Sequence, residues 1–390
     1  MNLVLFDDPA TRISLLPFTF TRPISKIRIG ILTIAEKWER RLNLAGSFLT
    51  DPYLQKKFPL KQAADNLFIN ASWCPTDDGV TAVKNLKTQE VLVKDEIILA
   101  WRSEELSLPD LKNSIPKIFP TEVTLIDKPW KIFQHNSAEI RADFKLITGG
   151  RTSAGIQDKH TIIYNEPNIF VEEGVTIRAA VLNAEDGPIY LGKNSSVQEG
   201  ALIKGPFALC EGSTVNMGGK MRGDTTVGPH SKVGGEVANS VIFGFSNKGH
   251  DGFLGNSVLG EWCNLGADTN TSNLKNNYEN VKLWSYAKDG FVDTGLQFCG
   301  LMMGDHSKCG INTMFNTGTV VGVSANIFGD GFPRNFIPSF SWGGAAGFTV
   351  YQLKKAYETA EKVMERRKIK LDDVEKEILA IVFELTVRKN

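Results

Sequence analysis

An aliphatic residue or methionine recurs at every sixth position between residues 191 and 233, and no other feature constrains the fold of this chain as strongly. The repeated positions are Leu191, Val197, Ile203, Leu209, Val215, Met221, Val227 and Val233. A period of six fits neither the 3.6-residue period of a helix nor the two-residue alternation of an ordinary strand. It is the hexapeptide pattern of a parallel β-helix, in which three hexapeptides form one triangular coil.

Small residues accompany this pattern four positions after most of the aliphatic ones. They are Ser195, Ala201, Ser213, Gly219, Thr225 and Ser231. The same register returns in a second run, at Met303, Cys309, Phe315, Val321 and Ile327. We therefore predict a left-handed parallel β-helix over residues 166–345, with the aliphatic side chains inside and the small residues at its corners. Residues 270–300 interrupt the period, so we expect them to form a loop outside the coils.

The two ends of the chain lack the repeat. Residues 1–165 combine strand-like runs, such as NLVLF at 2–6 and EIILAW at 96–101, with the amphipathic run ILTIAEKWERRL at 31–42. This alternation indicates an α/β domain. Residues 346–390 carry apolar side chains at three- and four-residue spacing, which predicts two amphipathic helices. The sequence thus predicts three domains.

Charge balance and cysteine content exclude several classes of protein. The 44 basic and 44 acidic residues cancel and no basic block stands out, so we expect no nucleic-acid partner. No apolar stretch is long enough to cross a membrane, and the first apolar run meets Asp7 and Asp8 too soon for a secretory signal. The five cysteines form no CxxC pair, which is typical of reduced thiols in a cytoplasmic protein.

Two segments carry a family resemblance. They read SNKGHDGFLGNSVLGEWCNLGADTNTSN at residues 246–273 and GLMMGDHSKCGINTMFNTGTVVG at residues 300–322. Residues 220–330 resemble the acetyltransferase half of the bifunctional UDP-N-acetylglucosamine pyrophosphorylase and glucosamine-1-phosphate N-acetyltransferase family. The resemblance implies transfer of an acetyl group from acetyl-CoA to an amino-sugar 1-phosphate. It also implies a homotrimer, because prisms of this family build their sites between neighbouring copies.

The resemblance assigns roles to several residues of the second domain. His250 falls on the catalytic base, and an imidazole can accept the proton of an attacking amine at cytoplasmic pH. Asn264 and Asn273 fall on residues that bind the sugar phosphate, Arg222 on its phosphate ligand, and Ala267 on a backbone position near the thioester. Without the resemblance, the alternative interpretation is that His250 is a solvated histidine in a loop. The asparagines would then turn coil corners or form ladders with neighbouring coils, and Arg222 would lie on a solvated face.

The family motifs do not fix the position of every expected ligand of the substrate and of coenzyme A. A family lysine lies in a deleted stretch, so Lys275 or Lys282 is the candidate replacement for its charge at the substrate. Residues 332–343 are aromatic enough to line the pantetheine arm of acetyl-CoA, and Arg334 is a candidate ligand for a coenzyme A phosphate. The alternative is that this segment is a hydrophobic strap between the β-helix and the following helix. A family tyrosine near the base is Phe253 here, which leaves the identity of the sugar open.

The first domain resembles sugar nucleotidylyltransferases but lacks their glycine-rich loop. Asp7, Asp8 and Pro9 occupy that loop, and proline removes a backbone amide that would hold a triphosphate. The two carboxylates are candidates for binding Mg²⁺. The candidate nucleotide-binding residues are Thr11, Arg12, Arg22, Lys26 and Arg28.

Three functional hypotheses follow. The whole chain resembles an alternative bacterial branch of the bifunctional family, sometimes named glucose-1-phosphate thymidylyltransferase. In the first hypothesis the chain is a transferase in which acetyl transfer is coupled to nucleotidylyl transfer from UTP or dTTP to a sugar 1-phosphate. In the second, only one half is active, and the acetyltransferase is favoured. In the third, the chain is a non-catalytic scaffold that binds sugar nucleotides.

Overall fold

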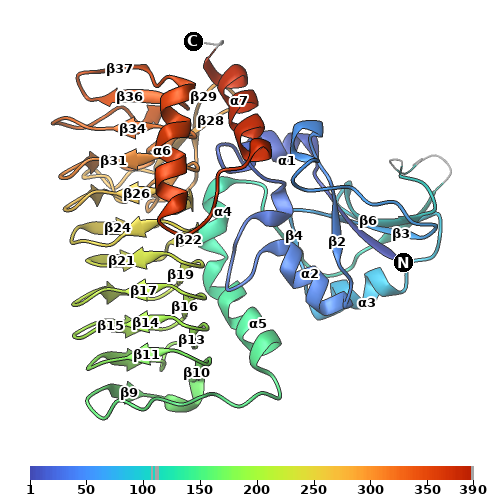
Figure 1. The fold of residues 1–390 in the computed structure, drawn as a ribbon. Coiled ribbons are helices and arrows are strands. Elements are labelled where there is room, and N and C mark those ends of the chain that lie inside the picture. Colours follow the sequence, from blue (N-terminus) through green and yellow to red (C-terminus); the bar gives the residue numbers. More distant parts are fainter. Residues whose placement is uncertain (107–108, 110–113, 388–390) are drawn as a thin grey trace. The chain divides into compact units, whose positions relative to one another are not determined.

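The computed structural model describes residues 1–106, 109 and 114–387. By its contacts the chain separates into two compact units (Figure 1). The first unit comprises Met1–Leu15, Thr21–Ile27 and Leu32–Lys128, and the second comprises Leu16–Phe20, Arg28–Ile31 and Pro129–Asn390. The helices that follow Lys128 therefore pack with the second unit. The domain boundary expected near residue 165 stays a prediction.

The first unit is built on a mixed six-stranded sheet. Its strands, in their order across the sheet, are β2 (Gly46–Leu49), β1 (Asn2–Phe6), β3 (Asn66–Asn70), β6 (Ile97–Ser103), β5 (Glu90–Lys94) and β7 (Ile115–Ile118). β1 is parallel to β2 and β3, whereas β6 is antiparallel to β3 and β5. A core of Val4, Phe6, Phe68, Val91 and Trp101 lies on this sheet, where the rings of Phe68 and Trp101 stack at 4.3 Å. The predicted α/β domain is confirmed.

Local signals fix the helices of this unit. They are α1 (Pro9–Ser14), α2 (Ile34–Leu42) and α3 (Asp77–Lys84), and a small sheet joins β4 (Trp73–Cys74) to β8 (Thr124–Leu125). α2 begins at a capping box, in which Thr33 and Glu36 each satisfy a backbone amide of the other, and it ends at Asn43 in the left-handed conformation. Short 3₁₀ turns occur in this unit at Ile24–Lys26 and Pro52–Leu54, and in the second unit at Phe18–Phe20 and Glu166–Asn168.

The second unit is the predicted parallel β-helix, and its short strands form three faces. The first face contains β10 (Ile169–Val171), β13 (Ile189–Leu191), β16 (Phe207–Leu209), β19 (Thr225–Val227), β22 (Val241–Gly244), β25 (Val258–Glu261), β30 (Met302–Met303), β33 (Val320–Val321) and β35 (Phe336–Ile337). The second contains β11 (Thr176–Ile177), β14 (Ser196–Val197), β17 (Thr214–Val215), β20 (Lys232–Val233), β23 (Asn247–Lys248), β26 (Asn264–Leu265), β31 (Lys308–Cys309), β34 (Asn326–Ile327), β36 (Ser341–Gly344) and β37 (Gly347–Val350).

The third face completes each triangular coil. It contains β9 (Ile162–Tyr164), β12 (Val181–Asn183), β15 (Leu202–Lys204), β18 (Lys220–Met221), β21 (Glu236–Ala238) and β24 (Phe253–Gly255). The pair β27 (Asn270–Thr271) and β32 (Met314–Phe315) continues it beyond β24. All eight predicted inward positions between Leu191 and Val233 are buried, so the hexapeptide register is confirmed.

Coil length changes after the regular run. Leu191 pairs with Leu209, and Leu209 with Val227, each one full coil of three hexapeptides further on. Val227 then pairs with Ile242, and Val233 with Lys248, in coils three residues shorter. The six-residue period is therefore lost in the sequence although the β-helix continues. Lys248 occupies the inward position that Val233 holds in the coil before it.

Helices cover two of the three faces. α4 (Pro129–Gln134) and α5 (Asn136–Thr148) contact strands of the first face, where Thr226 Oγ1 donates to Asn136 Oδ1 at 3.1 Å. The two predicted C-terminal helices are α6 (Leu353–Glu365) and α7 (Asp373–Val387), and Figure 1 shows α6 running alongside the stacked coils. Tyr357 of α6 donates its hydroxyl hydrogen to the carbonyl of Lys376 in α7 at 2.7 Å, which joins the two helices.

The insertion expected at residues 270–300 is more ordered than a loop. β27 remains in the coil, and the insertion then forms an antiparallel hairpin of β28 (Lys282–Ser285) and β29 (Gly290–Asp293). A bridge between Leu274 and Phe298 closes its base. The loop expectation was wrong in this respect, because the alternating apolar residues of the hairpin pair across its own strands rather than with the coils.

The sequence also led us to expect reduced cysteines in the core and no membrane-spanning segment. All five cysteines are free and buried, which agrees with reduced core thiols. Within the described part of the chain, no helix has the length and apolar character needed to cross a bilayer.

Candidate functional site

His250 lies in the turn that joins the second face to the third. β23 ends at Lys248 and β24 begins at Phe253, so residues 249–252 form the corner. Gly252 has a φ of 109°, and a Cβ there would lie 2.2 Å from the carbonyl oxygen of Thr269. The corner therefore requires glycine at this position. Asn216, one coil earlier, donates its side-chain amide to the carbonyl of Gly249 at 2.7 Å and holds the other side of the turn.

Lys248 holds the same turn from inside the β-helix. Its side chain is buried, and its Nζ donates to the carbonyl oxygen of His250 at 2.5 Å and to that of Asp251 at 3.0 Å. Burial lowers the pKa of Lys248 to about 8, partly opposed by the charges of Asp251 and Asp268. The lysine thus fixes the backbone of the residue that carries the candidate base. The sequence analysis did not single it out, although a lysine at an inward coil position is an unusual residue in that slot.

A cavity of about 480 Å³ opens beside this turn. Three of the predicted residues, His250, Asn264 and Ala267, line it together. The remaining wall is formed by coil residues of the second face and by the end of α6, and it includes Asn216, Lys232, Phe245, Asn247, Ile311, Val363, Arg366 and Arg367. The described residues lining this cavity include three cationic side chains and neither aspartate nor glutamate. The cavity therefore favours an anionic ligand.

The end of α6 supplies two of these cations. Arg367 donates to Asn247 Oδ1 at 3.2 Å, and Asn247 in turn contacts Asn264 Oδ1 at 3.5 Å. Burial lowers the pKa of Arg367, and the neighbouring Arg366 lowers it further. Two adjacent guanidinium groups, at a cavity whose described lining has no carboxylate, create a local excess of positive charge. Such an arrangement is common at sites that bind phosphate groups.

Two predicted residues lie away from this cavity. Arg222 follows β18 and pairs with Glu236 at 2.9 Å, and Asn273 donates to Asn256 Oδ1 at 2.7 Å. Both follow strands of the third face, whereas His250 precedes one. Because these strands are parallel and in register, the residues lie at opposite edges of this face. One copy of the chain therefore does not bring them together.

Three other predicted residues line a second cavity, of about 630 Å³. Lys275 and Lys282 reach it from the hairpin insertion, and Arg334 reaches it from the segment before β35. The described lining residues of this second cavity do not include His250. The structure thus divides the predicted acetyltransferase residues among two cavities and one face edge.

The candidate nucleotide-binding residues of the first unit are engaged in its fold. Arg12 is 7% exposed, and its guanidinium forms ion pairs with Asp7 at 3.2 Å and with Asp51. It also donates to the carbonyl of Arg22 at 3.1 Å and to the hydroxyl of Tyr53 at 2.9 Å. These contacts indicate a structural role for Arg12.

The other members of this set have similar contacts. Arg22 is buried, and the ammonium of Lys26 lies 4.8 Å from the centre of the Phe48 ring. Arg28 belongs to the second unit, where its Nε donates to the carbonyl of Phe243 at 3.1 Å. Thr11 donates its hydroxyl hydrogen to Asp8 at 2.8 Å.

Asp7 and Asp8 do not fit a magnesium site. Asp8 caps α1 by accepting from the amide and hydroxyl of Thr11. Asp7 accepts from the Ile24 amide at 2.9 Å and the Thr50 hydroxyl at 2.6 Å, and burial raises its pKa to about 6. In the described ranges no group of three or more His, Cys, Asp or Glu residues is placed to hold a metal.

The chain is similar to known proteins of two kinds, nucleotidyltransferases and acetyltransferases. Residues 3–152 match the family described as sugar nucleotidyl transferase. A bifunctional sugar-1-phosphate nucleotidylyltransferase/acetyltransferase of Sulfurisphaera tokodaii is 26% identical over 243 residues, which cover 60% of this chain and 53% of that protein. The chain thus combines a domain that matches sugar nucleotidyl transferases with a hexapeptide β-helix, and it is similar to a bifunctional nucleotidylyltransferase/acetyltransferase.

Other relatives match shorter stretches of the chain. The bifunctional protein GlmU of Methanocaldococcus jannaschii is 35% identical over 118 residues, which cover 30% of this chain and 26% of that protein. The chain thus spans about half or less of these two bifunctional relatives. Among solved structures, the polySia specific acetyltransferase NeuO matches with 14% identity and a TM-score of 0.26, over 50% of this chain and 85% of that one. The chain therefore shows distant homology to GlmU over part of its length.

Proposed function

We propose that this chain transfers an acetyl group from acetyl-CoA to the amine of an amino-sugar 1-phosphate, with His250 as general base. The observation that carries the proposal is the meeting of His250, Asn264 and Ala267 in one cavity with a cationic wall. Homology to acetyltransferases implies an acyl-CoA donor. The cavity offers an imidazole for the amine proton, an amide side chain for sugar hydroxyls and cations for phosphate.

The chemistry follows from these groups. The amine nitrogen attacks the thioester carbonyl carbon while an imidazole nitrogen of His250 accepts the amine proton. The C–N bond forms, the C–S bond breaks, and the imidazolium returns the proton to the departing thiolate. The backbone amide of Ala267 donates to the oxyanion of the tetrahedral intermediate, which stabilises charge that develops during the reaction.

A neighbouring copy completes the site in this proposal. Arg222 and Asn273 lie at the edge of the third face opposite His250, so they reach a sugar phosphate at His250 only from another copy of the chain. A closed ring of three prisms places one edge of each copy against the opposite edge of the next. This supports the homotrimer that the family resemblance implies.

We propose that nucleotidylyl transfer by the first domain is slow or absent. Arg12 is buried among Asp7, Asp51 and Tyr53 and is not available to a triphosphate. Positioning and charge stabilisation supply most of the catalysis of phosphoryl transfer, so loss of the glycine loop and the cationic side chain removes its main sources. UTP and dTTP with a sugar 1-phosphate remain the substrates to assay.

The experiment measures free-thiol release from acetyl-CoA in the presence of glucosamine 1-phosphate and other amino-sugar phosphates. We expect amine-dependent release by the wild type and a loss of roughly a hundredfold or more in His250→Ala, the usual effect of removing a general base. His160→Ala is the matched control, because His160 is exposed and lies outside the described lining of the cavity. Absence of amine-dependent release with every acceptor would favour the non-catalytic scaffold.

A further inference from the structure

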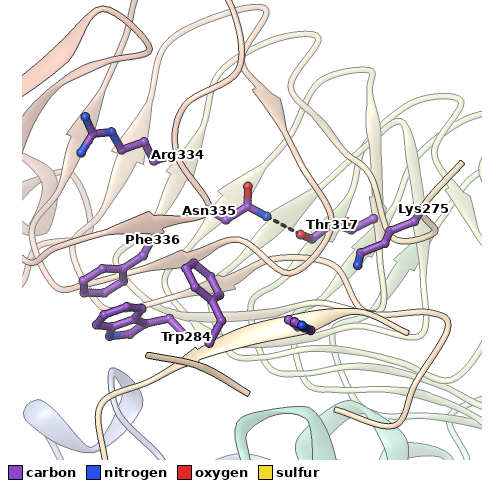
Figure 2. Close-up of a pocket in the computed structure, with 8 residues that line it drawn as sticks. Lys275, Trp284, Thr317, Arg334, Asn335 and Phe336 are labelled. Atoms are coloured by element: carbon purple, nitrogen blue, oxygen red, sulfur yellow. Dashed lines mark hydrogen bonds between the residues drawn. The ribbon is translucent and has the colours of Figure 1, made fainter. Parts of the chain in front are cut away.

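The second cavity combines an aromatic wall with a cationic rim. It lies between the hairpin of β28 and β29 and the strand β35 of the first face (Figure 2). Its volume of about 630 Å³ is in the range of sites for small organic ligands. The described lining residues are Lys275, Lys282, Trp284, Phe291, Thr317, Arg334, Asn335 and Phe336.

Three rings form the wall. Trp284 and Phe291 are cross-strand partners in the hairpin, and their ring centres lie 5.4 Å apart with an interplanar angle of 79°. Trp284 also stacks on Phe336 of β35, with ring centres 4.2 Å apart and an angle of 10°. The wall therefore joins the insertion to the β-helix, and the aromatic stack fixes its position. A planar apolar group packs favourably against such a surface.

Three cations form the rim. Figure 2 shows Arg334 and Lys275 on opposite sides of the cavity, while Lys282 belongs to the hairpin strand itself. Lys275 lies 3.9 Å from Glu279, a long contact to a largely exposed carboxylate. Among the described residues that line this cavity, there is no aspartate or glutamate. The rim thus favours a ligand with more than one negative charge.

The polar groups of the wall argue against a free sugar phosphate. Recognition of a sugar depends on several hydrogen bonds to its hydroxyl groups. Apart from the indole N–H of Trp284, the uncharged polar side chains of the described lining are those of Asn335 and Thr317, and Asn335 donates its side-chain amide to the Thr317 carbonyl at 2.7 Å. The cavity therefore offers large aromatic area and charge but few partners for hydroxyl groups. A planar base attached to phosphates satisfies these conditions.

We propose that this cavity binds a nucleoside phosphate, with the base against Trp284, Phe291 and Phe336 and the phosphates on Lys275, Lys282 and Arg334. The same chemistry occurs in two sources. One is the 3′-phospho-ADP part of a coenzyme A thioester, and the other is a free nucleotide or nucleotide sugar. The site shares no described lining residue with the His250 cavity, so binding of a nucleoside phosphate here does not require the His250 side chain.

The test is calorimetric titration of the full-length protein with ADP, which carries the chemistry common to both sources. We expect Lys282→Ala combined with Arg334→Ala to weaken binding about tenfold or more, since two charge-assisted contacts to phosphate are lost. Lys288→Ala is the matched control, because Lys288 is exposed on the hairpin but outside the described lining. Thermal unfolding of each variant confirms that it is folded.

Further ligands separate the sources and test the wall. Tighter binding of coenzyme A than of UDP or dTDP assigns the site to the acyl donor, and the reverse order assigns it to a nucleotide or nucleotide sugar. Equal binding of ADP and inorganic pyrophosphate, or no loss in the double variant, would overturn the proposal. His250→Ala retains ADP binding if the inference holds, so failure of the acetyl-transfer proposal is distinguished from failure of this one.

Discussion

The buried Lys248 connects the interior of the β-helix to the candidate base. It occupies an inward coil position, where its ammonium costs free energy because charged groups are poorly solvated in a protein core. Its two hydrogen bonds to the carbonyls of His250 and Asp251 offset part of this cost and order the turn. We interpret Lys248 as a positioning residue that acts through His250 rather than on substrate.

Replacing this lysine tests that interpretation. Lys248→Met keeps the length of the side chain but removes the donor, and we expect kcat for acetyl transfer to fall about ten- to a hundredfold, as for other small displacements of catalytic groups. The KM for acetyl-CoA should change little, because Lys248 is not among the described residues lining the cavity. A variant with normal kcat would contradict a positioning role.

The free energy of unfolding of the Lys248→Met variant provides a second test. The pKa of Lys248 is about 8 in the folded chain, below its ordinary value of 10.5, so the unfolded state binds more protons between these values. By linkage, the wild type gains stability as pH rises from about 8 to 10.5, and Lys248→Met lacks this gain. Urea unfolding at pH 7.5, 9 and 10 measures the difference between the two proteins. A difference independent of pH would show that Lys248 has an ordinary pKa in the fold.

At the scale of whole elements, the sequence predicted the strands and helices whose side chains repeat with a regular period. The hexapeptide positions are the buried interior, and the C-terminal spacing became α6 and α7. The short coils after Val233 and the hairpin at 282–293 were not predicted, because shorter coils shift the register and hairpin strands alternate with a period of two.

Some residues of the candidate site could also be predicted from the sequence, and others could not. His250, Asn264 and Ala267 were placed by a contiguous motif, and the structure brings them to one cavity. Arg366 and Arg367 were missed, because they reach this cavity only when α6 folds back over the second face. No local pattern distinguishes them from ordinary charges near a helix C-terminus, where basic residues are favoured.

These two arginines carry a prediction for α6. Arg366→Gln combined with Arg367→Gln should raise the KM for acetyl-CoA or for the sugar phosphate about tenfold or more, with a smaller change in kcat, because charge-assisted bonds to phosphate are lost. Lys362→Gln is the matched control, since Lys362 is exposed on the same helix and outside the described lining. Steady-state kinetics with each substrate varied in turn identifies which phosphate the arginines bind. Unchanged KM values for both would remove α6 from the site.

For the whole molecule, the third face of the β-helix is the candidate surface between copies. Its exposed apolar side chains include Ile162, Leu202 and Met314, and Met217 and Ile311 are exposed at the corner that also carries His250. Burying such side chains against another copy is favourable by roughly 25 cal/mol per Å² of apolar area. The surface and the divided site residues thus favour the same assembly.

Leu202→Glu tests this assembly without touching the cavity. Leu202 is 47% exposed, so the change should alter the stability of an isolated chain by less than about 0.5 kcal/mol. Across an interface, however, the charge loses its hydration, and we expect the trimer to dissociate and acetyl transfer to fall with it. Ile118→Glu, an equally polar change at a residue 80% exposed in the first unit, should leave both unchanged. Light scattering at micromolar concentration measures the mass. A monomeric wild type that retains acetyl transfer would show that Arg222 and Asn273 have no part in the site.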